Sequence, residues 1–205
     1  FDIYTVDLET REVTNVTDDE TYDGAPVFSP DGASIVFTSV IGENDGHLFR
    51  VDLENRSQRY RLTEGDWNDK DAIYSSNGTW LVFTSDRDSE RMTGRLVQSS
   101  GQGKEIYIMD YDGANQRRVT VNRSLNIGPA WGPDGRTLAY ASYASRYPDI
   151  YLTTLDGRAP TRPAQGTDMI HNQNPAFSPD GTRIAFTSNR SGQTGYYDVW
   201  AVNRD

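Results

Sequence analysis

Two histidines and a group of closely spaced aspartates are the residues of this 205-residue chain whose types suggest catalysis. His47 begins a predicted strand, where we expect an exposed side chain, and His171 precedes another predicted strand. Asp66, Asp69 and Asp71 are close enough in sequence to suggest the paired carboxylates of a glycosidase. That reaction needs two carboxyl groups at a set separation, which sequence spacing does not define. These residues therefore suggest acid–base chemistry without assigning it.

Metal binding and nucleophilic catalysis have weaker signals. The stretch DYDGAN from Asp110 resembles the first half of a calcium loop, but Val121 stands where that loop needs its twelfth-position glutamate. The chain has no G-x-S-x-G nucleophile motif and no cysteine. Asp31, Asp134 and Asp180 belong to recurring turns, where aspartate is a common turn former. We therefore predict no catalytic residue, no cofactor-binding residue and no metal site.

A repeated sequence motif predicts the strands and turns that position these residues. The stretch VFSPDGASIVFTS from Val27 returns as AFSPDGTRIAFTS from Ala176, with nine of thirteen residues identical. Two more divergent copies lie between them, and the second copy has SSNG in place of SPDG. The turn glycines of the four copies are 46, 57 and 46 residues apart, at Gly32, Gly78, Gly135 and Gly181. A period of this length indicates a repeat architecture such as a propeller.

Each copy predicts four short strands. Pro-Asp-Gly favours a type I turn that ends in a glycine with positive φ, which is a three-residue hairpin. The flanks are rich in Val, Ile, Phe and Thr, and a second alternating phrase, such as EIYIMDYDG from Glu105, predicts the third strand. One such sheet cannot bury both of its faces alone, so successive sheets must stack around an axis. We therefore predict an all-β fold, a β-propeller of four-stranded antiparallel blades. The alternative is a β-sandwich, which does not need a repeated unit.

The repeat resembles the TolB-like β-propeller repeat family. The resemblance is carried by APVFSPDGASIVFTS, EIYIMDYDG, QRRVT and NPAFSPDGTRIAFTSNRSG, and it covers almost the whole chain. It implies a single propeller domain over residues 1–205. The repeats are expected at residues 1–22, which form a partial blade, and at 23–66, 67–125, 126–170 and 171–205.

The predicted strands, two followed by twelve and then by three, leave two arrangements open. The last blade could take REVTNVT, from Arg11, as its fourth strand, which would close a small ring of four blades. Alternatively, the chain is part of a larger TolB-like propeller. The leftover strand FDIYTVD favours the larger ring, because a closed ring of four blades has no place for it.

Three segments that precede innermost strands are expected to place polar side chains near the axial opening of the propeller. Such side chains could form a rim that binds a peptide or a sugar. The alternative is that they cap the ends of strands and bond to the backbone. The candidate rim residues are Trp67, Asn68, Asp69, Asn126, His171, Asn172 and Gln173.

The loops between the second and third strands form a second candidate surface. The second full repeat is about 11 residues longer than its neighbours, and the extra residues lie in a polar loop from Asp86 to Lys104. The equivalent loop of the next repeat is rich in tyrosine and arginine, which are favoured in interface hot spots. The candidate partner-binding residues are Arg87, Arg91, Arg95, Lys104, Tyr143, Arg146 and Tyr147.

Composition narrows the classes of partner. The net charge of −10 argues against a nucleic-acid surface, and no apolar run is long enough to predict a transmembrane segment. The resemblance implies a bacterial periplasm or cell surface. We expect a non-enzymatic protein–protein interaction or scaffold module with a protein partner, an accessory subunit of a membrane-associated assembly. The alternatives are the substrate-recognition propeller of a peptidase whose catalytic domain lies elsewhere, and a carbohydrate-active propeller.

Overall fold

Within the described residues every regular element is a β-strand. The computed structural model describes residues 1–41, 46–88, 103–122, 124–156, 159–167, 169–191 and 196–204. These ranges contain sixteen strands, which form five antiparallel sheets. The predicted all-β fold of successive antiparallel sheets is confirmed.

Strands that follow one another in the sequence also pair in space, so each sheet is a simple meander. The first sheet consists of β1 (Tyr4–Val6) and β2 (Val13–Asn15). The second sheet consists of β3 (Tyr22–Phe28), β4 (Ser34–Val40), β5 (Gly46–Asp52) and β6 (Arg59–Arg61). The third sheet consists of β7 (Asp69–Tyr74), β8 (Trp80–Ser85), β9 (Glu105–Asp110) and β10 (Arg117–Arg118). The fourth sheet consists of β11 (Asn126–Trp131), β12 (Thr137–Ser142) and β13 (Asp149–Thr154). The fifth sheet consists of β14 (Asn172–Phe177), β15 (Arg183–Ser188) and β16 (Asp198–Asn203).

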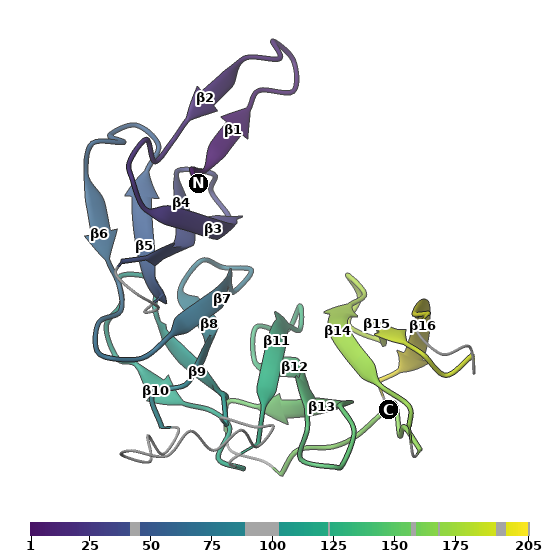
Figure 1. Ribbon diagram of the computed structural model, residues 1–205. Helices are drawn as coiled ribbons and strands as arrows, with labels where there is room; N and C mark the ends of the chain where they lie inside the picture. The colour runs from purple at the N-terminus through teal and green to yellow at the C-terminus, as the bar shows by residue number, and fades with distance from the viewer. Residues whose placement is uncertain are drawn as a thin grey trace.

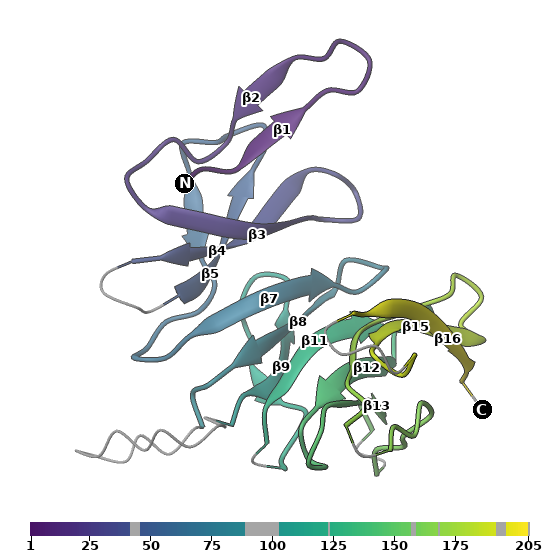
Figure 2. The ribbon, with the colours of Figure 1, turned by 45° about the vertical axis from the view of Figure 1, so that its right-hand side comes forward.

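The five sheets follow an arc, with the first strand of each larger sheet on its inner side (Figure 1). β3 packs beside β7, β7 beside β11 and β11 beside β14. The first and fifth sheets lie at opposite ends of the arc in both views (Figures 1 and 2). β2, which contains part of REVTNVT, pairs with β1. It therefore does not serve as the fourth strand of the last sheet, and the larger ring stays a prediction.

The hairpin turns have the conformation that Pro-Asp-Gly predicts. The four turn glycines have φ values of 72°, 73°, 62° and 71°. In the first turn the Asp31 carboxylate accepts hydrogen bonds from the Ser29 hydroxyl and the Ala33 amide. In the divergent turn Asn77 accepts the equivalent bonds from Ser75 and Thr79. The SSNG turn therefore keeps the same geometry, because an amide oxygen can replace a carboxylate oxygen as the acceptor.

The predicted fourth strand of the fourth sheet is reduced to one bridge. Leu152 pairs with Thr161, and no strand is assigned around it in the described residues. Pro160 and Pro163 lie on either side of Thr161. Proline has no amide hydrogen, so it cannot extend a hydrogen-bonded ladder.

Each innermost strand contains a β-bulge that the sequence did not predict. Register shifts occur at equivalent places in β3, β7, β11 and β14. One residue at each shift has a positive φ: Ala25 (50°), Asp71 (57°), Gly128 (60°) and Asn174 (53°). Bulges of this kind bend a strand and increase its twist, so they curve the inner strands at the same level around the arc.

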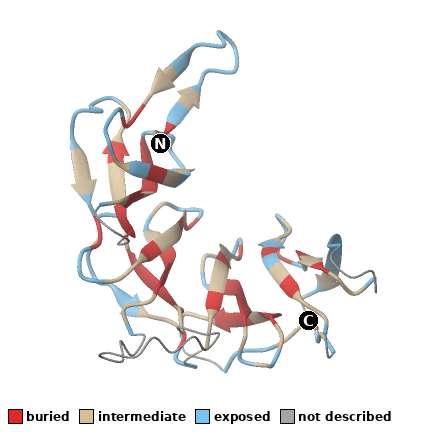
Figure 3. Ribbon diagram, viewed as in Figure 1, coloured by how far each residue is buried: buried red, intermediate tan, exposed pale blue. Residues whose placement is uncertain are grey.

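The hydrophobic core lies between neighbouring sheets. In β4, Ile35 and Phe37 pack with Ile3 and Val16, which flank the strands of the first sheet, whereas Val36 packs with residues of the third sheet. Second strands are therefore apolar on both faces, and buried residues concentrate in the middle of the interior sheets (Figure 3). Burying a side chain such as Phe37 contributes about 1.5–3 kcal/mol. We call the contacts between consecutive sheets the first, second, third and fourth junctions, in chain order.

The last sheet presents an uncovered apolar face. In the interior sheets, one apolar residue at the start of the third strand faces the following sheet; it is the third residue of β5 and the second residue of β9 and of β13. Leu48, Ile106 and Ile150 occupy this position and have no exposed surface. Val199 occupies the same position in β16 and is 78% exposed, because no sheet covers it within the described residues. The next residue, Trp200, points to the opposite face and is 39% exposed.

Candidate functional site

Three of the candidate rim residues lie inside the junctions. Asp69, Asn126 and Asn172 begin β7, β11 and β14, and each is 0% exposed. Asn126 Nδ2 donates to Glu105 Oε2 at 2.9 Å, and Asn172 Nδ2 donates to Asp149 Oδ1 at 2.8 Å. Both acceptors begin the third strand of the preceding sheet. A ligand cannot reach these side chains while the sheets remain in contact.

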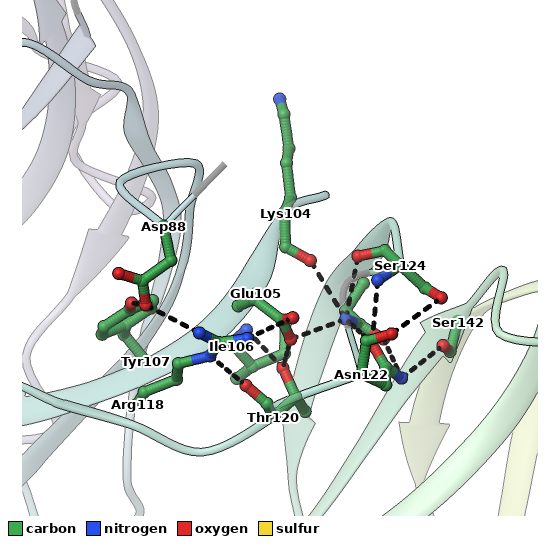
Figure 4. A network of polar contacts seen from close by, with 11 residues as sticks. Asp88, Lys104, Glu105, Ile106, Tyr107, Arg118, Thr120, Asn122, Ser124 and Ser142 are labelled. Atoms are coloured by element: carbon green, nitrogen blue, oxygen red, sulfur yellow. Dashed lines mark hydrogen bonds and ion pairs between the residues drawn. The ribbon is translucent and has the colours of Figure 1, made fainter. Parts of the chain in front are cut away.

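At the third junction, both oxygens of the buried Glu105 carboxylate have hydrogen-bond donors (Figure 4). The Glu105 carboxylate accepts hydrogen bonds from Arg118 Nη2 at 2.6 Å, from Asn126 and from the Thr120 hydroxyl. Thr120 Oγ1 in turn accepts the Ile106 amide at 2.9 Å. Glu105 is 2% exposed, so the guanidinium and the amide replace the water that burial removes. This arrangement ties the third sheet to the fourth.

Trp67, Asn68 and Arg87 belong to the second junction. Arg87 Nη2 donates to Asp69 Oδ1 at 2.9 Å, and Trp67 Nε1 donates to Asp69 Oδ2 at 3.0 Å. Asn68 Oδ1 accepts the Gly46 amide at 2.9 Å. Arg87 also lies over the Trp67 ring, at 5.2 Å from its centroid. These contacts give Arg87, a candidate partner-binding residue, a role within the fold.

His47 is buried, which corrects the expectation of an exposed side chain. It is 2% exposed, and its Nδ1 lies 3.9 Å from Asp69 Oδ2. β5 begins one residue earlier than the equivalent strands, at Gly46. Its second residue, His47, therefore lies at the position that Glu105 and Asp149, the first residues of β9 and β13, occupy at the later junctions. The sequence assigned it to a strand start but did not indicate which face of the strand it would occupy.

Of the three other basic candidates in the long loop of the third sheet, only Lys104 lies within the described residues. Lys104 is half-buried, and burial, followed by the nearby charge of Lys70, lowers the pKa of its amine. Its carbonyl oxygen accepts Asn126 Nδ2, whereas its side chain extends away from the network (Figure 4). Arg91 and Arg95 lie outside the described residues.

The structure brings the tyrosine-rich loop together with the start of β14 and the residue that precedes it. Gln173 Nε2 donates to Tyr143 Oη at 3.0 Å. The rings of Tyr147 and His171 have centroids 5.5 Å apart. Arg146 lies over the Tyr147 ring at 5.6 Å. Two of the candidate rim residues therefore join three of the candidate partner-binding residues.

A third loop adds a residue that sequence analysis missed. The Tyr197 hydroxyl lies 3.3 Å from His171 Nδ1, and Tyr197 is 48% exposed. Its loop precedes β16, as the tyrosine-rich loop precedes β13, so the repeat itself was the signal that could have indicated it. We call these residues the tyrosine patch, which consists of Tyr143, Arg146, Tyr147, His171, Gln173 and Tyr197.

The tyrosine patch is suited to noncovalent contact. Its rings offer large apolar surfaces with polar atoms at the edge, and such side chains lose little conformational entropy on binding. Burial, together with the nearby Tyr197 phenol, raises the pKa of Tyr143. The Tyr143 hydroxyl therefore stays protonated at neutral pH and remains able to donate a hydrogen bond. The described ranges contain no helical segment with the length and hydrophobicity that a bilayer crossing requires.

Consecutive antiparallel meanders, fanned about an axis with their first strands innermost, define a β-propeller fold. Its repeat sequence is that of a known propeller class. The TolB beta propeller domain family matches residues 91–204, which is more than half of the chain. The chain belongs to this family.

Known proteins resemble the chain in sequence and in fold. The Tol-Pal system protein TolB of Anaeromyxobacter dehalogenans is 31% identical over 169 residues, which cover 80% of this chain and 36% of that protein. The crystal structure of TolB from Acinetobacter baumannii superposes with a TM-score of 0.72 at 20% identity, covering 98% of this chain and 47% of that chain. The chain thus spans about a third of the length of the curated relative.

Two enzymes share the fold at lower identity. Oligogalacturonate lyase from Vibrio parahaemolyticus has a TM-score of 0.73 at 18% identity, covering 99% of this chain and 56% of the lyase. A puromycin-hydrolysing peptidase of Mycobacterium tuberculosis has a TM-score of 0.70 at 15% identity, covering 98% of this chain and 33% of the peptidase. Likeness at this level of identity describes architecture, not activity.

Proposed function

We propose that the chain is a non-enzymatic protein-binding module of the bacterial periplasm and part of an envelope assembly of the Tol-Pal type. The curated relatives are named as proteins of the Tol-Pal system, and this supports both the proposed assembly and the proposed periplasmic location. The tyrosine patch supports the mode of action, because it is the surface where two predicted sets of binding residues meet.

The tyrosine patch carries this proposal through its composition and exposure. Tyrosine and arginine are, with tryptophan, the residue types enriched among interface hot spots. Tyr197 is 48% exposed and Arg146 is exposed, whereas Tyr143 and Tyr147 are half-buried and held by neighbours within the patch. Side chains that are partly fixed before binding lose less entropy when a partner covers them. The acidic chain, with its net charge of −10, favours a partner that presents cationic or neutral surface.

Affinity isolation from the periplasmic extract of the native source tests the proposal. We expect the chain to recover one protein partner in stoichiometric amount, identified by mass spectrometry. The double variant Tyr147→Ala/Tyr197→Ala should lose this partner by tenfold or more. The matched control is Tyr111→Ala, which removes a tyrosine that is 50% exposed in the turn between β9 and β10.

Three results would reject the proposal. The chain could be recovered alone, or the double variant could retain the partner as well as the control does. Turnover of a peptide or of an oligogalacturonate by the purified chain would show that the chain is an enzyme and not only a binding module. Each variant should first be shown to unfold at the temperature of the unmodified chain, so that a loss of binding is not a loss of folding.

A further inference from the structure

The charge balance of the first junction differs from that of the later junctions. At the second junction Asp69 is bonded to Arg87. At the third junction Glu105 is bonded to Arg118, and at the fourth junction Arg162 Nη2 lies 2.5 Å from Asp149 Oδ2. In each case a buried carboxylate has a guanidinium partner within hydrogen-bonding distance. Its neighbour on the adjacent sheet is an imidazole or an amide, from His47, Asn126 or Asn172.

At the first junction both of these positions hold aspartate. Asp2 precedes β1 as Asp149 begins β13, and Asp23 lies at the start of β3 as Asn172 does in β14. Asp19 adds a third carboxylate, and one oxygen from each of the three lies within 4.8 Å of the others. Like charges this close repel one another unless a cation lies between them.

Arg59 contacts two of the three carboxylates, those of Asp19 and Asp23. Its Nη1 forms a hydrogen bond with Asp19 Oδ2 and lies 3.7 Å from Asp23 Oδ2. The Phe1 ammonium donates to the Thr21 carbonyl at 3.1 Å, at an exposed position. Arg59 therefore contacts Asp19 and Asp23, as Arg118 contacts Glu105 and Asp88 at the third junction. At the first junction, however, a third carboxylate, that of Asp2, belongs to the same cluster.

The Asp23 carboxylate carries an oxygen that its surroundings do not satisfy. Its side chain has no exposed surface, and within the described residues its Oδ2 accepts no hydrogen bond. The Arg59 distance of 3.7 Å is longer than a hydrogen bond. The other oxygen, Oδ1, accepts the Thr21 hydroxyl at 2.9 Å. Buried charged oxygens of proteins are normally paired or coordinate a metal ion.

We propose that Asp2, Asp19 and Asp23 form a binding site for a divalent cation of the calcium class. Carboxylate and carbonyl oxygens and water are the ligands that this hard cation prefers, at about 2.3–2.6 Å. Two oxygens bound to one Ca²⁺ can therefore be separated by up to about 5 Å, and the three carboxylate oxygens lie within 4.8 Å of one another. Asp19, whose side chain is 33% exposed, leaves room for water to complete the coordination shell.

The site would tie the first sheet to the rest of the arc. Asp2 lies just before β1, whereas Asp19 and Asp23 lie at the connection from β2 into β3. A cation held between the three carboxylates would attract all of them and would offset their mutual repulsion across the first junction. It would thus neutralise acids of this junction, as Arg118 neutralises Glu105 at the third junction, and would in addition connect two sheets.

Calorimetric titration of the EDTA-treated and dialysed chain with CaCl₂ tests this site. We expect one Ca²⁺ bound per chain, and a rise in the unfolding temperature on adding CaCl₂ that KCl of equal ionic strength does not produce. Asp23→Asn should weaken binding at least tenfold. The same variant should unfold at a higher temperature than the unmodified chain in EDTA, because it removes one of the repelling charges.

The control is Asp31→Asn, which changes an exposed turn aspartate outside the site and should keep the full Ca²⁺ response. If Asp23→Asn does not fold, Asp19→Asn should give the same loss of affinity. Absence of calorimetric heat together with an unfolding temperature that CaCl₂ does not change would overturn the proposal. So would a Ca²⁺ response that survives in both site variants, an equal loss in Asp31→Asn, or an equal response to MgCl₂, which would reject the calcium class.

Discussion

The junctions and the tyrosine patch use neighbouring residues for different purposes. His171, Asn172 and Gln173 are consecutive, yet Asn172 is 0% exposed and bonded across the fourth junction, whereas His171 and Gln173 contact tyrosines of the patch. Successive side chains of a strand point to opposite faces. The same segment of the repeat therefore supplies a structural contact and part of the proposed binding surface, and the strand register decides which residue does which.

The largest expected effect comes from removing the guanidinium of a junction. Arg118→Met should lower the free energy of unfolding by about 3 kcal/mol, because it leaves the buried Glu105 charge without its cation. Chemical denaturation at pH 7 measures this change. The double variant Arg118→Met/Glu105→Gln should recover much of the loss, since no buried charge then remains. Failure of the double variant to recover stability would show that the uncompensated charge of Glu105 is not the cause of the loss.

An adjacent pair of variants separates the two regions directly. Asn172→Ala should cost about 2 kcal/mol of stability, because Asp149 loses a hydrogen-bond donor inside the junction. Gln173→Ala should cost about 0.5 kcal/mol, since its bond to Tyr143 lies in the half-buried patch. Urea denaturation compares the two variants. Equal losses would contradict the division between junction and patch.

The smallest expected effect concerns an exposed contact between the fourth and fifth sheets. Burial alone would raise the pKa of Asp134, but hydrogen bonds from Thr137 and the Arg136 amide, with the charge of Arg204, lower it to about 2. The pKa of this carboxyl is therefore depressed in the folded chain. Its stabilising contribution is present above about pH 4, the usual aspartate value, and is lost as the pH falls through about 2.

Thermal unfolding between pH 5 and pH 2 measures this contribution. The difference in unfolding temperature between the unmodified chain and Asp134→Asn should shrink as the pH falls. The effect should be modest, because the Asp134 side chain is 36% exposed and solvent screens its charge. A difference that stays constant over this range would show that the carboxylate contributes through its shape and not through its charge.

Much of the fold followed from the repeat, because Pro-Asp-Gly turns and flanking β-branched residues act locally. The inner-strand bulges could not be predicted in this way. Only Gly128 among the four positive-φ positions is a glycine, and Ala25 gives no local signal for that conformation. The bulge recurs at the same place in each inner strand whatever residue stands there, so no residue type indicates it.

The candidate site was predicted in part. Tyr143 and Tyr147 were found from residue type and loop position, and the structure places them in the tyrosine patch. The burial of Asp69 and Asn126 depends on which face of a strand they occupy, and strand register was not available from the repeat alone. The acids of the first junction gave no signal, because Asp2 is separated by sixteen residues of sequence from Asp19.

Site-specific photo-crosslinking in cells of the native source tests the proposed binding surface most directly. A photoreactive residue at position 147 should form a covalent adduct with one envelope protein, whereas the same residue at position 111 should not. The two positions carry tyrosine in loops of different sheets, so they are matched in residue type. Identical adducts from both positions, or no adduct from position 147, would contradict a partner surface at the tyrosine patch.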